Sequence, residues 1–325
     1  MTGHSRTRAA FALIAALVLA LGVAACGGGD DDNDTGTSGG NSANLIKSNS
    51  ANNGIQLTVG SKNFTEEYIL GNIYAQALQA AGYDVKTNLN LGSEVIAYKA
   101  LQDGQISGYP EYTSTLLQSI FGAETVPADA QAAYAQAKQQ LEPKGETAFT
   151  PTPFADANAF GMLTSKANEL GVTKISDLKS KASQLTLYGS PECRTRRDCL
   201  LGLEQVYGLK FKKFTPVNID QRHEVLTSGQ ADVSIVFTTD PQIKRNDEVL
   251  LQDDKGMFPP YNSTFLMKKS VADKAGPDLA ATIDAVNKNL TADVMQELNA
   301  RVDLDKDTPE QAAQAYLKQF KLIPA

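Results

Sequence analysis

The sequence has no tryptophan and only two histidines and three cysteines among its 325 residues. It also lacks a G-x-S-x-G nucleophile elbow, a Walker A loop and a G-x-G-x-x-G fingerprint, which mark common hydrolases and nucleotide-binding proteins. His223 lies among charged residues in a helical pattern, so we expect it to face solvent rather than act as a base. These absences favour a protein that binds a ligand, with no catalytic role, metal or cofactor.

Acidic residues outnumber basic ones, with 37 Asp and Glu against 30 Lys and Arg, and the formal net charge is −7. Affinity for nucleic acid depends on a basic surface, so this balance argues against a nucleic-acid partner. After the first 53 residues, about 270 remain, which is enough for one large or two medium domains.

Residues 1–25 have the organisation of a secretory signal, with Arg6 and Arg8 before an apolar run. That run is too short for a comfortable membrane span. The residues up to Cys26 resemble a bacterial lipobox, which implies that Cys26 is lipidated and holds the protein on the extracytoplasmic face of the cell membrane. The alternative is an ordinary signal peptide or anchor that contains a cysteine. Residues 26–53 are rich in Gly, Ser, Asn and Asp, and we expect a disordered tether.

Cys193 and Cys199 are the two remaining cysteines, and five residues separate them. Outside the cytoplasm such a pair is a candidate for a disulfide bond. The alternative is two free, buried cysteines.

Segments of strand length alternate with helical patterns along the rest of the chain, which indicates an α/β fold with largely parallel strands. We expect strands near residues 57–59, 85–91, 106–109, 159–164, 185–188, 211–215 and 232–237. We expect helices near residues 65–81, 94–103, 113–121, 128–141, 176–182, 198–207 and 220–228, and mostly helix from 278 to 320.

Prolines mark two changes of segment, at Pro151 and Pro153 and again at Pro259 and Pro260. They suggest one lobe of residues 54–155 plus 262–325 and a second lobe of residues 156–261. Two lobes joined by two chain crossings leave a cleft between them, and such clefts are preferred ligand sites.

Five separated segments carry a resemblance to a known family. They are residues 60–66 (GSKNFTE), 109–115 (YPEYTST), 175–178 (ISDL), 237–240 (FTTD) and 252–261 (QDDKGMFPPY). In this order they resemble the quaternary-amine-binding proteins of osmoprotectant ABC importers, over nearly the whole folded part of the chain. The resemblance implies a two-lobed, periplasmic-binding-protein-like α/β fold that grips its ligand between the lobes.

The resemblance also implies a site, in which aromatic rings surround a quaternary ammonium group and polar groups hold a ligand carboxylate. The implied aromatic residues are Tyr112, Phe160, Phe237 and Tyr261, and the implied polar residues are Lys62, Thr115, Asn158 and Arg196. The neighbouring Arg194 and Arg197 are alternatives to Arg196. Two of the four aromatic positions carry Phe where the family often has Tyr, which leaves the preferred amine open.

These features predict a monomeric, lipid-anchored solute-binding protein that delivers glycine betaine, proline betaine, choline or carnitine to an ABC permease. One alternative is a binding protein for another solute such as an amino acid, whose ammonium group needs a carboxylate partner. Asp156 and Glu111 are the candidates for that partner. The other alternative is a sensor or an enzyme on the same fold.

Overall fold

The computed structural model describes residues 44–325. The predicted signal, Cys26 and most of the predicted tether lie outside this range. Within it, no helix combines the length and the apolar composition that a membrane crossing requires.

The last residues of the predicted tether belong to the folded part of the chain. Ile46 donates its backbone N–H to the carbonyl oxygen of Leu322 at 2.9 Å, and Asn49 donates to that of Ala81 at 3.1 Å. The side chain of Asn52 is buried and donates to the same Ala81 carbonyl. The expected tether is therefore wrong at its end, because polar side chains there find partners on the fold.

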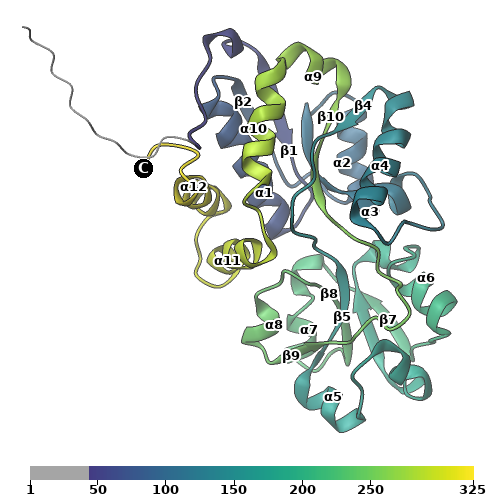
Figure 1. The fold of residues 1–325 in the computed structure, drawn as a ribbon. Helices are drawn as coiled ribbons and strands as arrows, with labels where there is room; N and C mark the ends of the chain where they lie inside the picture. Colours follow the sequence, from purple (N-terminus) through teal and green to yellow (C-terminus); the bar gives the residue numbers. More distant parts are fainter. Residues whose placement is uncertain (1–43) are drawn as a thin grey trace, which may run out of the picture. The chain divides into compact units, whose positions relative to one another are not determined.

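Within residues 44–325, ten strands form two sheets of five, and each sheet has helices around it (Figure 1). In spatial order, the first sheet contains β2 (Asp84–Asn88), β1 (Gln56–Gly60), β3 (Gly108–Tyr112), β10 (Ser263–Lys268) and β4 (Glu146–Ala148). The second contains β7 (Lys213–Pro216), β6 (Thr186–Gly189), β8 (Val233–Phe237), β5 (Asn158–Leu163) and β9 (Glu248–Leu250). The α/β class and the two-lobed arrangement agree with the predicted fold.

The described part of the chain has twelve α-helical segments, the last four of which follow the last strand, β10. They are α1 (Thr65–Ala80), α2 (Glu94–Gln102), α3 (Thr113–Thr115), α4 (Ala130–Leu141), α5 (Thr164–Leu170), α6 (Leu200–Gly202), α7 (Glu224–Thr227), α8 (Gln242–Arg245), α9 (Lys269–Ala275), α10 (Pro277–Asn287), α11 (Ala292–Asp303) and α12 (Pro309–Gln319). The expected positions of most elements agree with these bounds to within a few residues.

The first sheet is buried on both faces. Helices α1 and α10 lie on one face, and α2 and α4 lie on the other (Figure 1). Neighbouring residues of a strand point to opposite faces. In β10, Phe265 therefore packs toward α1 and α10, whereas Leu266 packs toward α2 and α4. Both side chains are fully buried.

The expectation of largely parallel strands is wrong for half of the pairings. In the first sheet β1 pairs in parallel with β2 and β3, but β10 runs antiparallel to β3 and β4. The second sheet likewise has two parallel and two antiparallel pairings. One antiparallel pairing joins the predicted strands β5 and β8, and the other three involve β4, β9 and β10, which were not predicted. Strands β4 and β9 have only three residues each, and β10 lacks polar alternation because both of its faces are buried.

The chain crosses between the sheets twice, and the two crossing segments lie side by side. Ala155 pairs with Asn262 in an isolated antiparallel bridge, and the N–H of Asp156 donates to the Tyr261 carbonyl at 3.1 Å. This places Asp156 and Tyr261 together at the junction of the sheets. Which residues move as one lobe remains a prediction.

Candidate functional site

A pocket of about 270 Å³ opens at the junction of the two sheets. Its lining residues come from both sheets and are Lys62, Asn63, Phe64, Ser93, Glu94, Tyr112, Thr115, Asp156, Asn158, Ser190, Pro191, Glu192, Arg196, Asn218, Ile219, Phe237 and Tyr261. Tyr112 is the last residue of β3 and Phe237 is the last residue of β8. The site therefore lies beyond strand ends, where open α/β sheets commonly bind ligands.

Four aromatic side chains line this pocket: Phe64, Tyr112, Phe237 and Tyr261. The Phe64 ring is stacked with Tyr112, with centroids 6.3 Å apart and planes at 19°. It also contacts Phe237, with centroids 5.3 Å apart. Ring faces offer negative electrostatic potential together with apolar contact, which suits a cation that carries no N–H donor.

The hydroxyl groups of both tyrosines are turned toward buried carboxylates. Tyr112 donates to Glu66 at 2.6 Å, and Tyr261 donates to Asp198 at 2.5 Å. Burial, followed by the nearby carboxylate charge, raises the pKa of each hydroxyl well above its ordinary value of 10. The hydroxyls thus keep their protons and fix the orientation of the rings.

Seven of the eight predicted ligand residues line the pocket, and Phe160 does not. Phe160 is fully buried in the core of the second sheet, where its ring lies 5.5 Å from that of Phe258. It stands two residues after Asn158 on β5, so it shares the same face of the strand but lies deeper in the sheet. Its assignment to the aromatic set is corrected here, and Phe64 is the fourth ring at the pocket.

The ammonium group of Lys62 is already partnered by acidic side chains. Its Nζ lies 2.5 Å from Glu111 and 3.4 Å from Glu67, and 4.2 Å from the ring centroid of Tyr112. Burial alone would lower the pKa of Lys62, but Glu111 and Glu67 outweigh it and raise that pKa. Burial raises the pKa of Glu67 to about 8. An ammonium has three N–H groups and only the contact with Glu111 is a hydrogen bond, so two remain for a ligand.

Arg196 reaches the pocket from a disulfide-closed loop. Cys193 and Cys199 form the predicted disulfide, with their Cα atoms 5.2 Å apart. The Arg196 guanidinium binds Asp198 through Nε at 2.8 Å and Nη2 at 2.5 Å, and binds Glu94 through Nη1 at 3.2 Å. A guanidinium has five N–H groups, so two remain for a ligand.

Close packing against Gly202 supports this loop. A Cβ atom added at Gly202 would lie only 1.8 Å from the carbonyl oxygen of Arg197. Only glycine therefore fits at the end of α6, where the chain packs against the backbone of the loop that carries Arg196.

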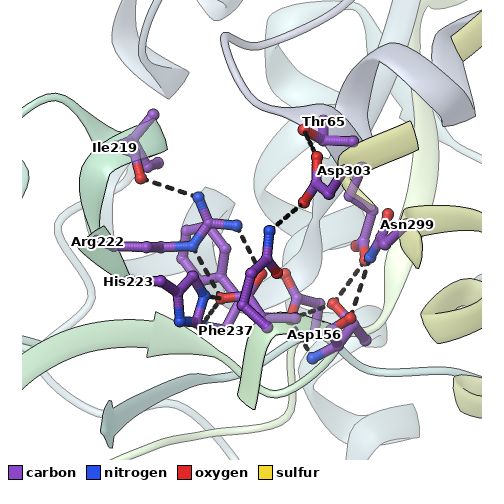
Figure 2. A network of polar contacts seen from close by, with 12 residues as sticks. Thr65, Asp156, Ile219, Arg222, His223, Phe237, Asn299 and Asp303 are labelled. Atoms are coloured by element: carbon purple, nitrogen blue, oxygen red, sulfur yellow. Dashed lines mark hydrogen bonds and ion pairs between the residues drawn. The ribbon is translucent and has the colours of Figure 1, made fainter. Parts of the chain in front are cut away.

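A chain of hydrogen bonds joins the two sheets behind Tyr112. The Thr239 hydroxyl lies 2.6 Å from Glu66 and 2.9 Å from Asp156, and Asn299 donates to Glu66 at 3.0 Å. Figure 2 shows Asp156 and Asn299 in this cluster. Burial, and then the charges of Glu66 and Asp240, raise the pKa of Asp156 well above its ordinary value. The ionised form of Asp156 is therefore disfavoured at the pocket.

Arg222 and His223 form a second buried cluster around Asp240 (Figure 2). Arg222 contacts Asp240 through two nitrogens at 2.6 and 2.8 Å, and its guanidinium carbon lies 4.8 Å from the ring centroid of Phe237. The N–H of Phe237 donates to Asp240 at 2.7 Å. The cluster thus holds Phe237 at the pocket from behind.

His223 is buried rather than facing solvent, which corrects the expectation from its charged neighbours. Its two ring nitrogens lie 2.8 Å from Glu248 and 2.9 Å from Asp240. Burial alone would lower the pKa of His223, but the hydrogen bonds to these carboxylates raise it above 6.5. The partners come from residues 17 and 25 positions away, so no local pattern in the sequence indicates them.

Comparisons with known proteins place the chain among transport components. The family model for the substrate binding domain of ABC-type glycine betaine transport systems matches residues 55–319. A glycine-betaine-binding protein of Pseudomonas aeruginosa is 33% identical over 278 residues, covering 82% of this chain and 88% of that protein. A carnitine transport binding protein of Listeria monocytogenes is 28% identical over 267 residues, covering 81% and 86%.

The solved structures agree in fold. The crystal structure of a glycine betaine/carnitine/choline ABC transporter protein is 25% identical, with a TM-score of 0.66, and the match covers 81% of this chain and 98% of that one. The matched proteins are binding components of transporters.

Proposed function

This chain belongs to the family of substrate-binding domains of ABC-type glycine betaine transport systems, and we propose that it captures quaternary amines and delivers them to a membrane permease. The amines proposed are glycine betaine, proline betaine, choline and carnitine. The observation that carries this proposal is the set of four rings, Phe64, Tyr112, Phe237 and Tyr261, around one pocket at the junction of two sheets.

The proposed roles follow from the chemistry of a quaternary ammonium group. It has no N–H to donate, so ring faces are the suitable partners, each contributing about 0.5–2 kcal/mol. The remaining N–H groups of Lys62 and Arg196 would hold a ligand carboxylate through charge-assisted bonds. Thr115 and Asn158 would add neutral polar contacts at the same pocket. Lobe closure around the ligand would exclude water and strengthen these contacts.

The test is isothermal titration calorimetry on the purified full-length protein, in a detergent without a quaternary ammonium headgroup. Glycine betaine, proline betaine, choline and carnitine are titrated beside several amino acids. We expect saturable binding of at least one quaternary amine and none of an amino acid. Because the chain has no tryptophan, fluorescence is a poorer readout than heat.

The same titration decides the alternative of an amino-acid binder. An amino acid carries a primary ammonium group, which needs an ionised carboxylate in the pocket. Glu111 does not line the pocket and is paired with Lys62, and Asp156 lines it but has a raised pKa. These two observations favour the quaternary amine. Binding of an amino acid alone would refute the proposal.

We also propose that Cys26 carries a lipid that holds the mature protein on the extracytoplasmic face of the cell membrane. The lipobox-like residues before Cys26 support this assignment. Changing Cys26→Ala is expected to move the protein from the membrane fraction to the soluble fraction after export. A Cys193→Ala variant is the matched control, because it removes a cysteine outside the signal. Unchanged membrane association of Cys26→Ala would contradict the anchor.

A further inference from the structure

A buried carboxylate lies behind one wall of the pocket. Glu66 does not line the pocket and is only 3% exposed. Three groups lie within hydrogen-bond distance of it: the Tyr112 hydroxyl at 2.6 Å, the Thr239 hydroxyl at 2.6 Å and the Asn299 amide at 3.0 Å. Burial raises the pKa of Glu66, and the hydrogen bonds from Thr239, Tyr112 and Asn299 oppose that rise by favouring the ionised form.

The count of protons in this cluster identifies which carboxyl group is neutral. The Thr239 hydroxyl lies between Glu66 and Asp156, at 2.6 and 2.9 Å, and it has only one proton to donate. If both carboxyl groups were ionised, one of these contacts would bring two acceptors together. One of the two groups must therefore carry a proton and donate it to the Thr239 oxygen.

The surroundings place that proton on Asp156. Glu66 also accepts from Tyr112 and Asn299, whereas the other hydrogen bond to Asp156 is a long one of 3.4 Å from the Thr239 N–H. Glu66 stands in the first turn of α1, a sixteen-residue helix whose N-terminus favours negative charge. Asp156 has its pKa raised well above the ordinary value, first by burial and then by the charge of Glu66. Asp156 therefore donates its proton to the Thr239 oxygen, and the Thr239 hydroxyl donates its own proton to Glu66.

We propose that Glu66 is a specificity-determining and positioning residue, whose negative charge behind Tyr112 makes the pocket select ligands that carry a positive charge. This inference rests on the proposed function and goes beyond it. The Tyr112 hydroxyl donates to the charge of Glu66, so the ring that faces the ligand becomes richer in electrons and more attractive to a cation. Attraction through a buried ring is weakly screened by solvent.

The arrangement also explains why Asp156 does not take over this role. Asp156 faces the pocket directly, and an ionised carboxylate there would attract primary ammonium groups of amino acids as well. With Asp156 neutral and Glu66 ionised, the negative charge lies behind Tyr112 and not on the surface of the pocket. The charge acts through a ring face, which a quaternary ammonium can contact although it has no N–H donor.

The test compares two ligands of the same shape and different charge in wild type and Glu66→Gln. One is choline, and the other is its carbon isostere, in which a tert-butyl group replaces the trimethylammonium group. Glutamine keeps the size of Glu66 and its capacity for hydrogen bonds but removes the charge. We expect the affinity for choline to fall about tenfold and that for the isostere to fall less than about twofold.

A matched control is available in the same lobe. Tyr98 donates its hydroxyl to the buried carboxylate of Glu146 at 2.7 Å, and neither residue lines the pocket. Glu146→Gln is expected to leave both affinities unchanged. A Tyr112→Phe variant keeps the ring but cuts its link to Glu66, and it is expected to lower the preference for choline over the isostere. Tyr112→Phe tests the proposal if the Glu66→Gln variant does not fold.

The outcomes separate this inference from the function on which it rests. Equal losses for choline and the isostere would show that Glu66 only supports the structure, and unchanged affinities would show no role; either result overturns this inference alone. If wild type binds neither choline nor glycine betaine, the proposed function fails, and the inference fails with it. A selective loss of choline in Glu66→Gln, absent in Glu146→Gln, supports both.

Discussion

Replacing Tyr112 or Tyr261 with alanine is expected to weaken the binding of a quaternary amine by at least about tenfold, the loss expected from removing one desolvated ring. Each change removes a ring face from the pocket and leaves a buried carboxylate, Glu66 or Asp198, without its hydroxyl donor. Calorimetric titration of the purified variants with glycine betaine and choline measures the loss.

Two further variants show whether that loss is specific. Tyr261→Phe keeps the ring and should retain most of the affinity that Tyr261→Ala loses. Tyr68 lies in α1 outside the pocket and donates its hydroxyl to Asn90, so Tyr68→Ala should bind like wild type. If both Tyr112→Ala and Tyr261→Ala also bind like wild type, the rings are not a ligand site.

The resemblance implies seven of the seventeen residues that line the pocket, and several of the seven stand in its short matching segments. Lys62 follows β1, and Thr115 follows the strand that ends at Tyr112. Such positions at strand ends need little knowledge of the rest of the fold. Phe64 was missed although it stands two residues after Lys62 in a quoted segment.

Long-range partners explain the remaining errors. The sequence does not indicate that Lys62 is paired, because its partner Glu111 lies 49 residues away and reaches it through the pairing of the first sheet. The resemblance implied Phe160 as a pocket residue, but the structure buries it deeper along β5, in the core of the second sheet.

The stability contributed by the buried cluster around Asp240 depends on pH, and it falls at both low and high pH. Burial alone would raise the pKa of Asp240, but Arg222 and His223 outweigh it and lower that pKa below 3.8. The stability contributed by Asp240 is therefore present above pH 3.8 and lost as the pH falls through the lower pKa of the folded state. His223 has a raised pKa, so its contribution is complete below pH 6.5 and lost as the pH rises through that raised value.

Changing Asp240→Ala is expected to lower the free energy of unfolding by about 3–5 kcal/mol, because it leaves the buried charges of Arg222 and His223 without their shared partner. Asp273→Ala is the control, since it breaks an ion pair with Lys269 in which both side chains are more than half exposed, and solvent screening limits its cost to at most about 1 kcal/mol. Urea denaturation at pH 6, followed by circular dichroism, measures both losses.

Because the N–H of Phe237 also loses its acceptor, Asp240→Ala should in addition weaken ligand binding, whereas Asp273→Ala should not. Equal losses of stability in the two variants would contradict the view that the buried cluster holds Phe237 in place.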